Sequence, residues 1–326
     1  MTVEDVLASL PPIADIAMAA PLVSAVDRHA VSRIAWDDFW TRDRTQEEWL
    51  VPPFLARGRG HSLYAPAKGG KSLFTLYVTA RAAAGLAVLD HPGGAPVRTL
   101  YLDLEMTEDD VYERLVDMGM GPHVDLEPFA YHVLPSLAVL DSQAGGDEVL
   151  ELARAHDADL VVVDTTSRVI GGEENSADTM RGFYRWTGGP LKAAGIAALR
   201  LDHAGKDLDR GQRGSSAKAD DVDVVWRLTP RDGNRYDLQA THRRMGWVPQ
   251  TTTIHQTADP LAFSVATDSW PAGTREAAER LDALDVPLDH GKTKARAALS
   301  AAGIKVSNEA LAAGLRWRRT QAETLT

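Results

Sequence analysis

The chain has 326 residues, of which 44% are hydrophobic and 25% charged, and its formal net charge is −11. This composition is typical of a soluble globular protein and excludes a largely disordered or fibrous chain. The length suggests about two domains. An acidic surface argues against non-specific coating of duplex DNA, although it is compatible with nucleic acid held in a local basic channel.

The sequence contains no cysteine. Disulfide scaffolds, thiolate zinc sites and cysteine nucleophiles are therefore excluded, and a reducing, cytoplasmic location is expected. No stretch reaches the ~18 apolar residues that would cross a bilayer, so we expect no membrane span. Glu4 and Asp5 stand where a secretory signal would carry basic residues, which predicts no export signal.

Composition predicts three parts. Residues 1–33 form an N-terminal arm, which is either helical or loose, residues 34–270 form a main α/β domain, and residues 271–326 form a small helical module. Within the main domain, the aromatic-rich residues 33–58 are expected to pack against a core or a neighbouring subunit rather than to stack on a ligand.

From residue 60 onward, short apolar runs alternate with helical stretches. Strands are expected at residues 61–64, 99–104, 129–134, 160–163 and 196–201. Helices are expected at residues 72–85, from 107 onward, 146–155 and 177–195. This β-α-β alternation predicts a mostly parallel sheet with helices on both faces. Four further runs predict an antiparallel extension of the sheet: 222–228, 235–241, 247–253 and 261–266.

Beyond residue 271 the composition shifts to Ala, Arg and Leu, which predicts three short helices. A module of this size is typical of a helix-turn-helix or winged helix. DNA binding and a purely structural packing role both stay open for it.

The most informative motif is Ala65-Pro66-Ala67-Lys68-Gly69-Gly70-Lys71-Ser72, between a predicted strand and a predicted helix. A phosphate-binding loop needs converging backbone N–H groups, a lysine for the β- and γ-phosphate oxygens and a hydroxyl for Mg²⁺. We therefore expect a nucleotide triphosphate to contact Ala67, Lys68, Gly69, Gly70, Lys71, Ser72 and Leu73. Ala65 stands where such loops usually begin with glycine, and it would be strained if that position required a positive φ.

A second Gly-Lys-Thr tripeptide, at Gly291–Thr293, lacks this context. It follows neither a strand nor a glycine-rich segment, so we do not expect it to bind phosphate.

Two predicted strands end in carboxylates. Asp164 follows the apolar run 160–163, as does the acid that holds Mg²⁺ in many phosphate-loop enzymes, and Ser72 would be the second metal ligand. Glu105 follows the strand at 99–104, where it could polarise a water for attack on the γ-phosphate. The alternatives are an ordinary strand-terminal turn for Asp164 and a helix cap for Glu105.

Three further features follow along the chain. His203 ends a strand and could hydrogen-bond the γ-phosphate. The glycine- and serine-rich loop after it carries Lys206, Arg210 and Arg213, which could contact a nucleic-acid backbone. Arg244, in the predicted antiparallel extension, could stabilise transition-state charge in a neighbouring subunit. A polar strand end, a solvated loop and a surface arginine are the respective alternatives.

Taken in order, these motifs resemble the RecA-type ATPase core of the plasmid RepA hexameric helicase and of related phage and actinobacterial ATPases, with DnaB-type helicases as more distant relatives. The resemblance spans roughly residues 34–255 and implies a RecA-like P-loop NTPase fold with ATP and Mg²⁺ as cofactors. It implies that Glu105 is the catalytic base, His203 the γ-phosphate sensor and Arg244 an arginine finger given in trans. It also implies a homo-oligomer, a hexameric ring, acting on single-stranded DNA. His242 stands where DnaB-like hairpins usually carry lysine.

The resulting expectation is an ATP-hydrolysing, DNA-translocating enzyme, a replicative helicase of the RepA or DnaB type. Two alternatives stay open: a RecA-like recombination or repair ATPase, and a regulatory protein in which ATP only switches partner affinity.

Overall fold

The computed structural model describes residues 34–41, 49–174, 176–203, 221–231, 234–266, 270–271 and 273–324. The chain divides into two units, residues 1–44 and 45–326, and each is described by itself. In the first unit, the short helix α2 (Trp36–Thr41) brings three aromatic rings into mutual contact, with centroids 5.0–6.4 Å apart, and leaves Trp36 and Trp40 exposed.

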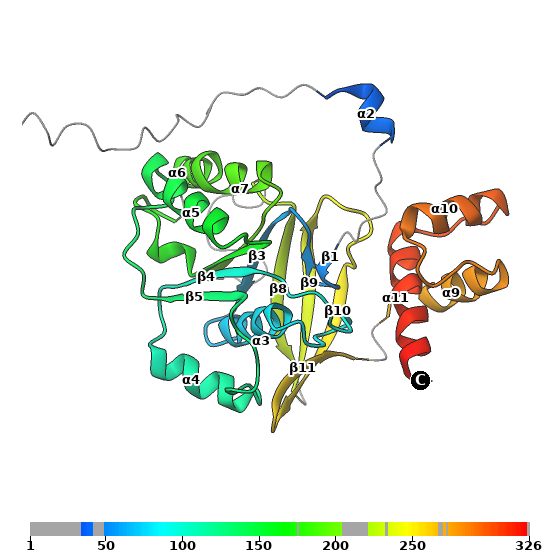
Figure 1. Cartoon of the computed structure of the whole chain (residues 1–326), viewed down its shortest axis with the longest axis horizontal. Helices are drawn as coiled ribbons and strands as arrows, with labels where there is room; N and C mark the ends of the chain where they lie inside the picture. Colours follow the sequence, from blue (N-terminus) through cyan, green and yellow to red (C-terminus); the bar gives the residue numbers. More distant parts are fainter. Residues whose placement is uncertain are drawn as a thin grey trace, which may run out of the picture. The chain divides into compact units, whose positions relative to one another are not determined.

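The second unit is built on a nine-stranded sheet in the order β11-β10-β9-β8-β3-β7-β6-β4-β5 (Figure 1). The strands are β3 (Gly60–Ala65), β4 (Thr99–Asp103), β5 (Phe129–Val133), β6 (Leu160–Asp164), β7 (Ala197–His203), β8 (Val224–Arg231), β9 (Arg235–Arg243), β10 (Thr251–Ala258) and β11 (Leu261–Val265). Strands β8, β3, β7, β6, β4 and β5 pair in parallel, and β9, β10 and β11 continue the sheet antiparallel. The predicted mostly parallel sheet with an antiparallel extension is confirmed.

Helices cover both faces of this sheet, which explains why its central strands are continuous apolar runs. The helices α3 (Lys71–Ala83) and α4 (Glu108–Asp117) pack on one face, and α5 (Gln143–Ala155), α6 (Ala177–Phe183), a π-helix (Tyr184–Gly188) and α7 (Gly189–Ala193) pack on the other. Each face of the sheet has its own hydrophobic core. Alternate residues of β6 belong to different cores: Val162 lies in the core on the α3 side, and Val161 and Val163 lie in the core on the α5 side. The α/β fold class is confirmed (Figure 1).

One strand starts later than the sequence predicts. The strand expected at 247–253 begins only at Thr251, because Trp247 and Val248 form a turn in which the Val248 N–H donates to the Met245 carbonyl. The Trp247 ring is buried edge-on against Trp49, at 4.7 Å between centroids. Trp49 belongs to a small hairpin of β1 (Trp49–Val51) and β2 (Leu55–Ala56), which therefore packs against the core as expected.

Three helices follow the sheet, as predicted: α9 (Thr274–Ala283), α10 (Lys292–Ala301) and α11 (Asn308–Thr324). We call residues 273–324 the C-terminal module. It has its own small apolar core, which includes Leu281, Leu299 and Leu311. Ala312 of α11 also belongs to the main core, so the module packs against the sheet domain.

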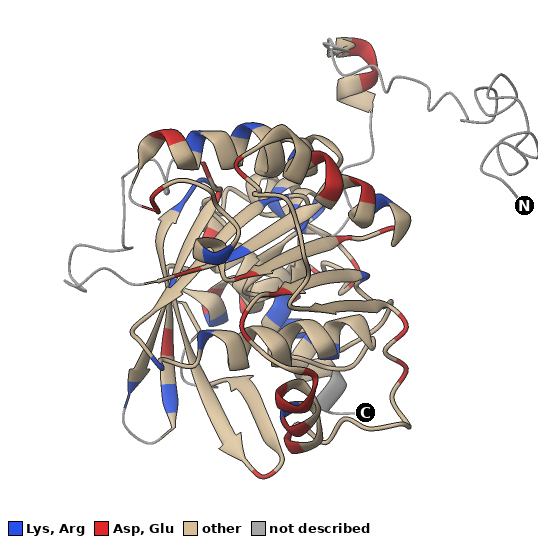
Figure 2. Cartoon of the chain, turned by 90° about the vertical axis from the view of Figure 1, so that its left-hand side faces the viewer, with Lys and Arg blue, Asp and Glu red and all other residues tan. Residues whose placement is uncertain are grey.

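Acidic and basic residues are interspersed along the helices and strands seen in Figure 2. Among the described residues, no helix is long and apolar enough to cross a membrane.

Candidate functional site: a phosphate loop with two carboxylates

The loop between β3 and α3 is shaped to receive an anion. Its backbone turns tightly, with the Gly69 N–H donating to the Pro66 carbonyl at 2.8 Å, and Lys68 and Gly70 have φ values of 58° and 82°. Gly70 is the N-cap of α3 and offers no capping side chain. The first N–H groups of a helix lack acceptors within the helix, and they carry partial positive charge, which makes this end of α3 a ready phosphate site.

Gly69 is required by close packing. A Cβ atom at this position would lie 2.8 Å from the Pro66 carbonyl oxygen and 3.0 Å from the Ala65 Cβ. Ala65 itself is the buried last residue of β3, paired in register with His203. The positive φ values of the loop fall on Lys68 and Gly70, whereas Ala65 is extended strand, so the condition under which Ala65 would be strained is not met.

Asp164 lies beside the loop at the end of β6. Its Oδ1 accepts a hydrogen bond from the Ser72 hydroxyl at 3.2 Å and lies 4.0 Å from Lys71 Nζ, while its Oδ2 accepts from the Tyr101 hydroxyl at 2.9 Å. Burial raises the pKa of Asp164 to about 6, against the lowering effects of Lys71 and of the Ser72 hydrogen bond. The fold thus brings together Lys71, Ser72 and Asp164, which the sequence had placed in one site.

The Ser72–Asp164 pair fits Mg²⁺. In the described part of the chain, no group of three or more His, Asp or Glu side chains is placed to hold a metal ion by itself. Mg²⁺, however, usually keeps several waters and takes one or two protein oxygens together with phosphate oxygens. A hydroxyl and a carboxylate in contact, next to a phosphate loop, supply that donor set.

Glu105 lies just beyond β4, at the same edge of the sheet. Its turn is held by Asp103, whose Oδ1 accepts from the Glu105 N–H at 2.8 Å and from the Met106 N–H at 2.9 Å. The Glu105 carboxylate is one-third exposed and lies 3.9 Å from Arg168 Nε. Because β4 and β6 are neighbours, with Asp103 opposite Asp164, Glu105 and Asp164 lie at the ends of adjacent strands.

His203 is half-buried at the end of β7, opposite Ala65, and so at the same edge as the phosphate loop. Lys206, Arg210 and Arg213 lie outside the described residues.

Arg244 lies at the opposite end of the parallel strands from the phosphate loop. Its N–H donates to the Asp223 carbonyl at 2.8 Å and its Nη1 lies 3.9 Å from Asp223 Oδ1. Asp223 in turn is hydrogen-bonded through its backbone and side chain to Gly60, the first residue of β3. The phosphate loop begins at the other end of this strand, roughly 20 Å away at 3.3 Å per residue. Arg244 therefore cannot reach the phosphate loop of its own chain without a large movement.

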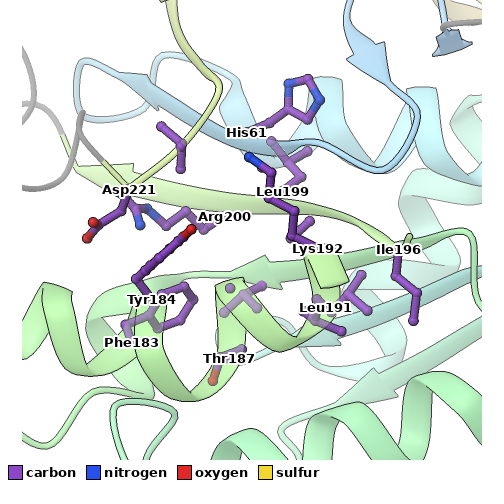
Figure 3. A pocket seen from close by; sticks show the side chains of 16 residues that line it. His61, Phe183, Tyr184, Thr187, Leu191, Lys192, Ile196, Leu199, Arg200 and Asp221 are labelled. Atoms are coloured by element: carbon purple, nitrogen blue, oxygen red, sulfur yellow. The ribbon is translucent and has the colours of Figure 1, made fainter. Parts of the chain in front are cut away.

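Figure 3 shows a hollow between the sheet and the π-helix. Like Arg244, this hollow lies near the Gly60 end of β3. It is lined mainly by apolar side chains: Phe183, Leu191, Ile196 and Leu199. The cations at its wall are paired, Lys192 with Asp223 at 2.7 Å and Arg200 with Asp202 at 3.0 Å. An apolar hollow with neutralised cations does not suit a triphosphate, so this hollow is separate from the phosphate site.

Three tyrosines belong to the surroundings of the site and were missed in the sequence. Tyr101 donates to Asp164, Tyr131 donates to Asp103 Oδ2, and the Tyr236 ring lies 3.6 Å from the position of a Cβ on Gly70. The alternation of β4, which places Tyr101 and Asp103 on one face, was the available signal for the first. The other two come from elements distant in sequence.

Comparison with known proteins gives a family match and a similar solved structure. Residues 27–209 match the AAA domain family (AAA_25). No curated protein matches the sequence. Among solved structures, a KaiC-like protein from the hyperthermophilic archaeon Pyrococcus horikoshii is similar, with 13% identity and a TM-score of 0.46 over 65% of this chain and 90% of that chain. The family match covers more than half of the chain, including the phosphate loop, Glu105 and Asp164. The chain belongs to the AAA domain family.

Proposed function

We propose that this protein hydrolyses ATP and uses the energy to move along single-stranded DNA as a ring of identical subunits, in the manner of replicative helicases of the RepA and DnaB type. The observation that carries the ATPase part is the convergence of the phosphate loop, Asp164 and Glu105 on one edge of the sheet. The DNA and ring parts rest on the order of the motifs and on the position of Arg244.

The residues of the phosphate loop, from Ala67 to Leu73, bind the triphosphate in this proposal. Lys71 neutralises the β- and γ-phosphate oxygens, while Ser72 and Asp164 hold Mg²⁺, which when bound adds further positive charge beside the phosphates. Glu105 accepts a proton from the attacking water, and its partial exposure leaves room for that water. His203 contacts the γ-phosphate and responds to its loss.

The proposed ring is based on the phosphate site and Arg244 lying at opposite edges of the sheet. A phosphate site at one edge and Arg244 at the other suit a head-to-tail contact, in which each subunit inserts its arginine into the next site. Such contacts close into a ring when their rotation permits it, and six subunits are expected from the resemblance. Lys206, Arg210 and Arg213 would face the DNA.

The decisive experiment measures ATP turnover with and without single-stranded DNA. We expect Lys71→Ala to lose ATP binding and turnover, and Glu105→Gln to bind ATP but turn it over ~10²–10⁴-fold more slowly, the usual contribution of a general base. The chain offers a matched control in Lys294→Ala, because Lys294 is an exposed lysine of α10 and its removal should leave turnover unchanged. Unchanged turnover in Lys71→Ala would refute the proposal.

Two further measurements separate the alternatives. Strand displacement on a forked duplex is expected of a translocating helicase, whereas strand pairing without displacement would indicate a recombination or repair ATPase. Light scattering with ATP and DNA should give a mass above that of a monomer. Tight ATP binding with slow turnover that DNA does not stimulate would instead indicate a nucleotide-switched regulatory protein.

A further inference from the structure

The turn that joins β9 to β10, residues 243–250, carries Arg244 and is bridged by a side chain from the C-terminal module. One carboxylate, that of Glu309, lies 3.2 Å from Arg243 Nη1 through its Oε2 and accepts the Gln250 N–H at 3.1 Å through its Oε1. Arg243 Nη1 also donates to the Val248 carbonyl within the turn. Both ends of the turn are thus tied to the first turn of α11.

The position of α11 relative to the sheet domain is itself well anchored. Arg316 pairs with Asp90 at 3.6 Å, both side chains being almost completely buried, and its guanidinium lies over the rings of Trp49 and Trp270 at 5.9 and 5.7 Å. Lys292 of α10 lies over Trp247, inside the same turn. The module therefore contacts the turn and the sheet domain through several charged and aromatic side chains.

Arg244 depends on this support. Its backbone N–H is bonded to the Asp223 carbonyl, and the residue before it is held by Glu309, while its own side chain is half-exposed and pairs loosely with Asp223 at 3.9 Å. The direction in which such a side chain leaves the surface is set by the backbone that carries it. Removing the Glu309 carboxylate takes the acceptor from Gln250 N–H and the counter-ion from Arg243, so the turn loses its bridge.

We propose that Glu309 is a positioning residue for Arg244, and that the C-terminal module thereby takes part in ATP hydrolysis at the neighbouring subunit's site. This inference rests on the proposed function, in which Arg244 acts in trans. It assigns the module a role inside the ATPase in place of the DNA-binding role open from its size alone.

The test mixes variant subunits. Glu309→Ala by itself should lower turnover on the order of tenfold, a part of the 10³–10⁵-fold that an arginine finger contributes, with the affinity for a fluorescent ATP analogue within about twofold of wild type. Lys71→Ala subunits have no working site but carry an intact Arg244. Adding them in excess should restore turnover at Glu309→Ala sites, because the arginine then comes from a correctly built neighbour. Arg244→Ala mixed with Lys71→Ala is the positive control.

The controls keep the two claims separate. Glu279→Ala removes an exposed acid from the same module and should leave turnover unchanged. If Arg244→Ala alone keeps full turnover, Arg244 does not act as an arginine finger in trans, and the proposed role of Glu309 is also refuted. If Arg244→Ala is rescued by mixing but Glu309→Ala is not, or if Glu309→Ala matches wild type, the finger stands and the Glu309 proposal is overturned. Thermal unfolding of each variant confirms that the subunits are folded.

Discussion

The Tyr131→Phe substitution tests how the loop of the proposed catalytic base is held. Asp103 is completely buried and accepts three hydrogen bonds, from the N–H groups of Glu105 and Met106 and from the Tyr131 hydroxyl. Burial and the hydrogen bond to Asp103 raise the pKa of Tyr131, so its hydroxyl stays protonated and donates. The ring of Tyr131 stacks on that of Tyr101, 4.7 Å away with an interplanar angle of 19°.

Phenylalanine keeps this ring and removes a single oxygen, so the apolar contacts change little. A hydrogen bond to a charged group contributes ~1.5–3 kcal/mol, and the buried carboxylate is left with two donors in place of three. We therefore expect the free energy of unfolding to fall by ~1.5–3 kcal/mol. The Glu105 turn should also loosen. Because a misplacement of ~1 Å can cost ~10²-fold, we expect kcat to fall by up to that factor while ATP binding is retained.

Urea unfolding measures the first effect, and turnover beside titration with a fluorescent ATP analogue measures the second. Tyr112→Phe is the matched control, since Tyr112 is 70% exposed on α4 and the change should be silent. If Tyr131→Phe unfolds at the same urea concentration as Tyr112→Phe and keeps the wild-type kcat, the Asp103 hydrogen bonds do not hold the site together. A loss of ATP affinity equal to the loss of kcat would likewise refute the reasoning, because it would place the damage in the phosphate loop.

Three further outcomes are expected. Gly69→Ala should weaken ATP binding on the order of tenfold, because its Cβ would lie 2.8 Å from the Pro66 carbonyl oxygen and shift the loop. Equilibrium binding measures this effect, and wild-type affinity would show that the loop accommodates the Cβ without losing its function. Burial lowers the pKa of His61 to about 4, below its unfolded value of 6.5, so this residue's contribution to stability is present above pH ~6.5 and lost as the pH falls toward 4. Urea unfolding should therefore show a loss of ~2–3 kcal/mol between pH 7 and 4.5 in wild type that is absent in His61→Gln, and equal losses would contradict the assignment. Asp90→Ala should cost ~3–5 kcal/mol of unfolding free energy by leaving Arg316 buried without its counter-ion, whereas the double change to leucine at both positions should cost much less. Equal costs for the single and double variants would show that the ion pair is not what matters.

Much of the architecture could be predicted from local patterns. Apolar runs such as 160–163 are read correctly as buried strands, because a sheet covered on both faces leaves no polar positions inside its strands. Strand ends were less certain, since hydrogen-bond partners decide where a strand stops. The segment 247–253 illustrates this: its first residues have strand-like composition, but Trp247 is used to pack against Trp49.

The sequence by itself predicted the tight loop between β3 and α3, because its glycines act through the local backbone. It also determined that Asp164 ends a strand and that Glu105 follows one, and parallel strands bring their carboxyl ends to one edge. Only the tertiary structure decided that Ala65 is unstrained, that Tyr131 and Asp103 hold the Glu105 turn, and that Arg244 lies at the opposite edge with Glu309 beneath its turn. Some of these contacts join residues far apart in the chain, such as Tyr131 with Asp103, 28 positions apart, and Arg243 with Glu309, 66 positions apart. Others depend on strand register. Tertiary packing sets both, and it leaves no local pattern in the sequence.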